Sequence, residues 1–180
     1  MKVKNDIPIE FANRIINAGP VILLTASHNG ATTVSTIAWH MPASKSPMLF
    51  AVSISNSGYS LELLAGSKAF CLNLPDYSLV DKVRYCGVHS GRDVDKFMMA
   101  GLTPVNCRAV PTFYVEECIA HAECSVEEIH QAGDHKLIIG KVLDAYCDEF
   151  VFDKNNVIDL NRIKLIHHLG GVHFCETKTL

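Results

Sequence analysis

The chain has 180 residues and a formal net charge of −3, from 16 basic and 19 acidic residues. This length suits one domain with a full hydrophobic core, and we expect residues 1–180 to form a single domain. The charge balance argues against nucleic acid or a membrane surface as a partner, and no run approaches the roughly 20 apolar residues of a membrane span. Because the first ten residues, MKVKNDIPIE, lack the apolar region of a signal peptide, a cytoplasmic location is expected.

Seven cysteines are present, an odd number that favours reduced thiols over a disulfide framework. Cys118, His121 and Cys124 have a metal-like spacing, but the apolar residues around them alternate as in a strand. On a strand, His121 points away from the face that the two cysteines share. No metal site is therefore expected there.

The first half of the chain predicts strands joined by short turns. The expected elements are a helix around 11–16, strands over 21–27, 32–39, 48–54 and 68–74, and a helix over 60–66. Asn29-Gly30 between two β-rich runs is the strongest short-range hairpin signal. Residues 41–47 contain two prolines and are expected to be a loop, and Ser60 is the expected N-cap of the second helix.

The second half predicts two further helices and then β-structure. The expected elements are helices over 78–87 and 95–100 and strands over 107–115, 117–130 and 136–146. Ser78 and Asp81 form a capping-box pattern at the start of the first of these helices. Short strands with helices only as insertions indicate a mainly β fold with inserted helices, an antiparallel barrel. No nucleotide-binding or hydrolase signature is present.

The strand over 32–39, TTVSTIAW, carries hydroxyl groups on both faces. Alternation puts Thr33, Ser35 and Trp39 on one face, and Thr36 and Ala38 on the other. Threonine also suits an ordinary barrel strand, so this pattern alone leaves both interpretations open.

Small polar residues crowd the segment before the helix over 60–66, including Ser53, Ser55, Ser57 and Ser60. Hydroxyl groups beside a helix N-terminus are suited to binding phosphate, although a solvated loop with an ordinary cap gives the same pattern. Arg92 and Lys96 are candidate cations for such a site, or else members of a solvated helix surface.

His135 follows Gly133-Asp134 in a turn between two predicted strands, where a side chain can project over the mouth of a barrel or simply remain exposed. Trp39, the only tryptophan, is suited either to packing beside a planar ring or to the core.

The order of several motifs resembles the flavin reductase-like family with the FMN-binding split-barrel fold, and is most similar to its flavoredoxin branch. The matching segments are TTVSTIAW, AFCLNLP, SGRDVDKF, AECSVE, GDHKLIIGKV and HLGGVHF. The resemblance implies an antiparallel Greek-key split barrel that binds FMN non-covalently at a homodimer interface. It implies flavin contacts from Thr33, Ser35, Thr36, Ala38 and Trp39, phosphate contacts from Ser53 and Ser60, and further contributions from Lys96, His135 and His168.

Three functional hypotheses follow from this resemblance. The first is an FMN-containing oxidoreductase that takes electrons from NADH or NADPH, with His135 as the catalytic proton donor. The second is an electron carrier of the flavoredoxin type that exchanges electrons with a redox partner protein without nicotinamide turnover. The third is a chain that has kept the fold but binds another ligand or only a partner.

Overall fold

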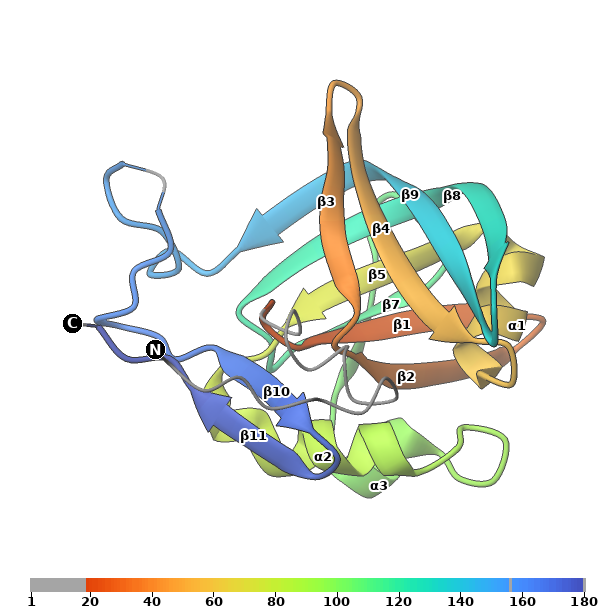
Figure 1. Cartoon of the computed structure of the whole chain (residues 1–180), viewed down its shortest axis with the longest axis horizontal. Helices are drawn as coiled ribbons and strands as arrows, with labels where there is room; N and C mark the ends of the chain where they lie inside the picture. Colours follow the sequence, from red (N-terminus) through yellow and green to blue (C-terminus); the bar gives the residue numbers. More distant parts are fainter. Residues whose placement is uncertain (1–18, 156, 180) are drawn as a thin grey trace, which may run out of the picture.

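The computed structural model describes residues 19–155 and 157–179, so the helix expected around 11–16 lies outside the described residues. Seven antiparallel strands form one sheet in the order β2-β1-β5-β8-β9-β4-β3 (Figure 1). Their bounds are Ile22–His28 (β1), Ala31–Ile37 (β2), His40–Lys45 (β3), Met48–Ser55 (β4), Ala69–Leu74 (β5), Ala120–Ala132 (β8) and His135–Cys147 (β9). The backbone N–H of Ser53 in β4 donates to the carbonyl of Trp39 at 2.9 Å, which extends the β3–β4 pairing by one residue.

The β1–β2 hairpin predicted around Asn29-Gly30 is confirmed. Asn29 has φ 51° and Gly30 has φ 80°, the left-handed values that a tight two-residue turn requires. Ile22 pairs with Ile37 and His28 pairs with Ala31, so the register holds along the whole of both strands.

The loop expected over 41–47 is wrong, because most of this segment is strand β3, paired with β4. Pro42 is tolerated because β3 is the last strand of the sheet, where a missing N–H costs no ladder bond on the open side. The pairing shifts register between Pro42 and Ser44, which is consistent with a bulge beside the proline. The β3–β4 hairpin projects beyond the rest of the barrel (Figure 1).

Two apolar cores lie on the two faces of β1 and β2. Alternate residues of β1, such as Ile22 and Leu24, belong to the core inside the barrel, which also contains Phe70 and Ile138. Leu23 faces the other way, into a second core. This two-sided burial explains why the strand reads as a nearly continuous apolar run. The expected mainly β, antiparallel split barrel with inserted helices is confirmed.

Helices pack against both of these apolar cores. They are α1 (Tyr59–Ser67), α2 (Val80–Val88) and α3 (Lys96–Ala100), with a short 3-10 helix (η2, Tyr77–Leu79) before α2. Val83, Cys86 and Phe97 bring α2 and α3 into the second core. Figure 1 shows α2 and α3 below β2, beside the strand pair β10 (Ile166–Gly170) and β11 (His173–Glu176). No helix in the described residues is long and apolar enough to cross a membrane.

Both predicted helix caps are wrong. The N-cap of α1 is Gly58, which makes no side-chain cap hydrogen bond, and Ser60 lies inside the first turn. The capping residue is Asp76, directly before η2, and its side chain accepts the backbone N–H of Ser78. Ser78 is therefore the residue that is capped and not the cap. Neighbouring Ser, Asp and Gly residues offer several equivalent cap positions, and local sequence does not choose among them.

The single strand expected over 107–115 is also wrong. Only its last three residues are a strand, β7 (Phe113–Val115), which pairs with β6 (Pro104–Asn106), just before the expected range, in a separate two-stranded ribbon. The connecting residues are held by the buried carboxylate of Glu123, which accepts the backbone N–H groups of Arg108 and Ala109. A carboxylate on another strand fixes this turn, so the residues of the turn give no sign of it.

Candidate functional site

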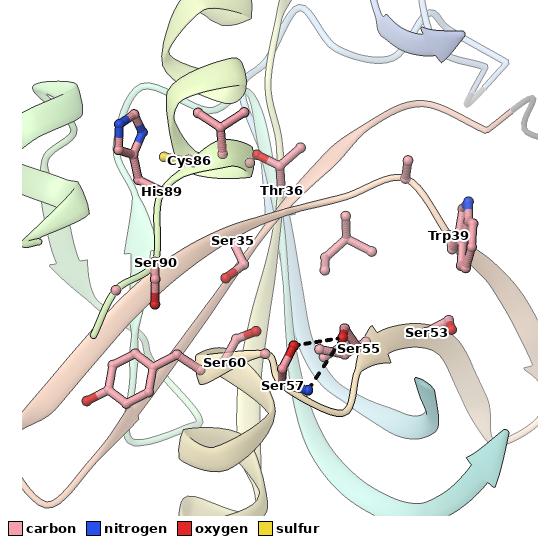
Figure 2. A pocket seen from close by; sticks show the side chains of 18 of the residues that line it. Ser35, Thr36, Trp39, Ser53, Ser55, Ser57, Ser60, Cys86, His89 and Ser90 are labelled. Atoms are coloured by element: carbon pink, nitrogen blue, oxygen red, sulfur yellow. Dashed lines mark hydrogen bonds between the residues drawn. The ribbon is translucent and has the colours of Figure 1, made fainter. Parts of the chain in front are cut away.

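A cleft of about 590 Å³ opens between the ends of β2 and β4, the N-terminus of α1 and the connection from α2 to α3 (Figure 2). It brings together nine of the ten predicted site residues. They are Ser35, Thr36, Ala38, Trp39, Ser53, Ser60, Lys96, His135 and His168.

Thr33 is the exception, because it lies beneath the wall of the cleft. Its side chain is buried, and its hydroxyl oxygen has no hydrogen-bond partner among the described residues. Gly91 closes over it so tightly that a β-carbon on this glycine would overlap the Thr33 hydroxyl. Thr33 therefore supports the wall rather than lining the cleft.

Serine hydroxyl groups line one side of the cleft. Figure 2 shows Ser53, Ser55, Ser57 and Ser60 along the end of β4 and the turn into α1. Ser55 Oγ lies 3.1 Å from Ser57 Oγ, so the turn holds two of these hydroxyl groups together. The first-turn N–H groups of a helix have no intrahelical acceptors, and α1 has no side-chain cap. Hydroxyl donors beside an uncapped helix N-terminus form a site suited to phosphate.

Arg92 adds a fixed positive charge beside this turn. Its guanidinium donates to the carbonyl of Ser57 at 2.9 Å and to Glu62 Oε2 at 2.8 Å. It also lies over the ring of Tyr59, 5.0 Å from the centroid. These contacts pin the turn to α1, so Arg92 is more than a solvated surface charge.

Lys96 is a buried wall residue, with 5% of its surface exposed. Its Nζ donates to the carbonyl of Cys86 at 2.7 Å, which ties the start of α3 to α2. Burial lowers the pKa of Lys96, because the charged ammonium loses its hydration. The solvated-surface alternative for this lysine is therefore wrong.

His135 and Trp39 line the cleft beside the serines of β4, because Ser53 N–H donates to the carbonyl of Trp39 and Ser55 pairs with His135 across β4 and β9. Their ring centroids are 5.0 Å apart with an interplanar angle of 36°. His135 Nδ1 lies 2.6 Å from Asp134 Oδ1, and this hydrogen bond lowers the pKa of Asp134. Because a carboxylate only accepts, Nδ1 carries a proton and Nε2 is the nitrogen left for a ligand.

Thr36 has a structural contact as well as a place in the cleft. Its hydroxyl donates to the carbonyl of Val83 at 2.6 Å and so holds α2 against β2. The oxygen can only accept from a ligand while this bond persists. Ser35 lies on the other face of β2, and its hydroxyl points toward the serine side of the cleft in Figure 2.

Several lining residues escaped the sequence prediction. Tyr59, His89 and Ser90 line the cleft, as do Gly170 and Gly171. Ser90 belongs to the segment SGRDVDKF and the two glycines belong to HLGGVHF, so the family motifs could have predicted these three residues as part of the site. Tyr59 and His89 stand alone in the sequence, and only the fold reveals their position.

The cysteine–histidine spacing does not form a metal site. Cys118 lies in the second core and Cys124 in the core inside the barrel, whereas His121 Nδ1 bonds to Asn73 Oδ1 at 2.9 Å. Within residues 19–155 and 157–179, no group of three or more His, Cys, Asp or Glu side chains is placed to hold a metal ion.

The donor set fits FMN. Hydroxyl groups and the α1 N-terminus suit its phosphate, and the flat side chains of Trp39 and His135 in the same cleft suit its ring. The same cleft therefore offers both kinds of contact that a flavin mononucleotide needs.

Comparison with known proteins gives the family. Residues 14–172 match the model of the flavin reductase like domain. Protein YddH of Escherichia coli (strain K12), described as uncharacterized, is 30% identical over 175 residues, which is 93% of each chain.

Two solved structures share the fold. Flavoredoxin of Desulfovibrio vulgaris (Miyazaki F) has a TM-score of 0.80 at 24% identity, with 89% of this chain and 87% of that chain covered. An FMN-binding protein of Thermus thermophilus with bound 1-cyclohex-2-enone has a TM-score of 0.84 at 22% identity, with 100% and 97% covered. The chain therefore belongs to the flavin reductase-like family and has its flavin-binding split-barrel fold.

Proposed function

We propose that this protein is an FMN-binding oxidoreductase that takes electrons from NADH or NADPH. The observation that carries the proposal is one cleft that holds both the serine hydroxyl groups at the α1 N-terminus and the flat side chains of Trp39 and His135. This combination matches a ligand that has both a phosphate group and a planar ring.

The phosphate end is built to hold an anion. Ser53 and Ser60 donate from β4 and from the first turn of α1, and the N–H groups of this turn add to them. Arg92 keeps the turn in place through the carbonyl of Ser57. The helix dipole and these donors stabilise a phosphate group without a counter-charge in direct contact.

The ring end orients the flavin and supplies a proton. When bound, FMN provides a ring that accepts a hydride and passes on the electrons. Trp39 positions the edge of this ring. The Nδ1–H of His135 donates to Asp134, so its Nε2 faces the ligand, where it accepts a proton when the imidazole is neutral and donates one when the imidazole carries both protons. Lys96 adds positive charge to the wall, which favours a reduced, anionic ring.

The protein is proposed to act as a homodimer in the cytoplasm. Trp39 at the rim of the cleft is 41% exposed, and Met41 and Met48 of the projecting hairpin are 56% and 43% exposed. Large apolar side chains grouped at a rim are typical of protein interfaces. Light scattering on the purified protein measures this directly, and a monomer at micromolar concentration would contradict it.

Anaerobic mixing of the FMN-loaded protein with NADH or NADPH tests the reaction. Prompt bleaching of the flavin absorbance supports the oxidoreductase. A protein that binds FMN tightly but is not bleached is instead an electron carrier of the flavoredoxin type, which would then be reduced by a redox partner protein. A protein that stays colourless with added FMN contradicts both forms of the proposal.

Substitution of His135 separates binding from proton supply. His135→Gln keeps a polar side chain beside Trp39 but removes the imidazole that can pass a proton. We expect FMN to remain bound and the rate of flavin reduction to fall. An unchanged rate of reduction would remove His135 from the catalytic role.

A further inference from the structure

A second cleft, of about 430 Å³, adjoins the first on the side of α2 and the β10–β11 pair. The two clefts share seven lining residues, among them Thr36, His89 and His168. Thr36 and His89 both lie in the upper part of Figure 2, with Cys86 between them. A molecule in the second cleft would therefore meet whatever occupies the first.

Aromatic rings form two walls of the second cleft. On α2, Tyr85 and His89 stack with centroids 4.0 Å apart and an interplanar angle of 20°. His89 Nδ1 lies 3.0 Å from the carbonyl of Tyr85, which fixes the stack. On the β10–β11 pair, His168 and Phe174 are cross-strand partners with centroids 5.0 Å apart. Flat, apolar walls of this kind favour a planar ligand over a bulky one.

Arg84 is the one arginine or lysine among the described residues that line this second cleft. Arg84 lies over the Phe174 ring, 5.5 Å from its centroid, and its NH1 contacts Asp81 Oδ1 at 3.2 Å. This ion pair spans three residues of one helix, and its side chains are 44% and 90% exposed. Pairs so exposed are worth little, so a ligand carboxylate can replace Asp81 at small cost. A guanidinium binds carboxylate through two parallel hydrogen bonds.

We propose that the second cleft binds a planar, ring-bearing carboxylate, with the ring between the two aromatic walls and the carboxylate on Arg84. This site deepens the proposed function, because it would bring an organic anion next to the flavin cleft. The aromatic walls select flat molecules and Arg84 selects negative charge. Neither feature depends on the serine-lined end of the first cleft.

The test uses the FMN-loaded protein and three probes of similar size: benzoate, neutral benzamide and non-planar cyclohexanecarboxylate. Isothermal titration calorimetry measures each affinity. We expect benzoate to bind about fivefold tighter than benzamide, since one exposed charge-assisted contact is worth about 1 kcal/mol. Benzoate should also bind tighter than cyclohexanecarboxylate, because the non-planar ring does not fit between the flat walls.

Two arginine variants locate the charge selection. Arg84→Gln should lose the preference for benzoate over benzamide while its affinity for benzamide stays unchanged. Arg162→Gln is the matched control, because Arg162 also pairs with an aspartate three residues away, Asp159 at 3.4 Å, and does not line either cleft. It should bind all three probes as the unmodified protein does.

The proposal is overturned if benzoate and benzamide bind equally, if none of the probes binds, or if Arg84→Gln retains the preference. Repeating the titration on flavin-free protein tests the carboxylate site separately from the proposed function. If the protein binds benzoate selectively but fails to bind FMN, the carboxylate site stands and the proposed function is wrong. If the protein binds FMN but does not distinguish the probes, the proposed function stands and the carboxylate site is wrong.

Discussion

Gly91 packs directly over the buried hydroxyl group of Thr33. A β-carbon at Gly91 would overlap the Thr33 oxygen and would lie 2.9 Å from Thr33 Cβ and 3.0 Å from Tyr59 Cδ1. The loop that carries Ser90 can therefore reach the cleft only because this position has no side chain. The strand over 32–39 thus acts in two ways: it lines the cleft, and through Thr33 it supports the opposite wall.

Gly91→Ala should displace the loop that carries Ser90, because the backbone of residue 91 must move away from Thr33 to remove the overlap. Since this loop lines the cleft, we expect FMN binding to weaken by about tenfold. Gly87→Ala is the control in the same cleft, since its β-carbon would lie 3.4 Å from Thr36 Cβ, an ordinary contact. Quenching of FMN fluorescence on binding measures both affinities. Equal affinities for the two variants would show that the loop yields without cost.

Lys96→Met should reduce stability and FMN affinity together. The variant leaves the Cys86 carbonyl without its buried donor, which costs about 1–3 kcal/mol in unfolding free energy, and removes a positive charge from the cleft. Urea unfolding and FMN titration measure the two effects. Lys82→Met is matched, because Lys82 also donates to a carbonyl, that of Gly101, but does not line the cleft. A loss of FMN affinity in Lys82→Met as large as that in Lys96→Met would contradict a local role for the charge.

Glu123→Gln should destabilise the fold by about 2–4 kcal/mol, because this fully buried carboxylate accepts two backbone N–H groups and the Tyr146 hydroxyl. Burial raises the pKa of Glu123, but the hydrogen bonds from Arg108, Ala109 and Tyr146 outweigh it and leave the pKa lowered. Chemical denaturation measures the change. Glu127→Gln on the same strand is exposed and should stay within about 0.5 kcal/mol of the unmodified protein. A similarly small effect at Glu123 would mean that the connection between β6 and β7 is held by other contacts.

His121 should make the protein less stable in mild acid. Asn73 donates through Nδ2 to Leu23 O, so its Oδ1 accepts from His121, and the ring is held neutral. Burial lowers the pKa of His121 to about 4 from 6.5. Between these values the unfolded chain binds a proton that the folded chain does not, so stability is full above pH 6.5 and is lost as pH falls toward 4.

The difference corresponds to about 3 kcal/mol at most. Urea unfolding at a series of pH values should therefore show a steeper acid loss in the unmodified protein than in His121→Gln. Parallel curves for the two proteins would contradict this linkage.

Local sequence was enough for the features that depend on neighbouring residues. Asn29-Gly30 specifies its hairpin through backbone conformation alone, and the apolar alternation around it specifies strands. The motif order specified the family, and nine of the ten predicted site residues meet in one cleft. Where the expectations failed, the deciding contact came from elsewhere: β4 turns the proline-containing segment into a strand, and Glu123 on β8 divides the segment before β7.

The sequence by itself determined that hydroxyl groups follow both faces of residues 32–39 and that serines precede a helix, because side-chain alternation and residue type are local properties. Tertiary structure decided what each of these groups does. Thr33 is buried because Gly91 packs over it, Thr36 holds α2 through Val83, and Ser35 is left facing the cleft. The physical reason is that a hydroxyl group acquires its role from the residue that packs on it or bonds to it, and Gly91 and Val83 lie some fifty residues away in the chain.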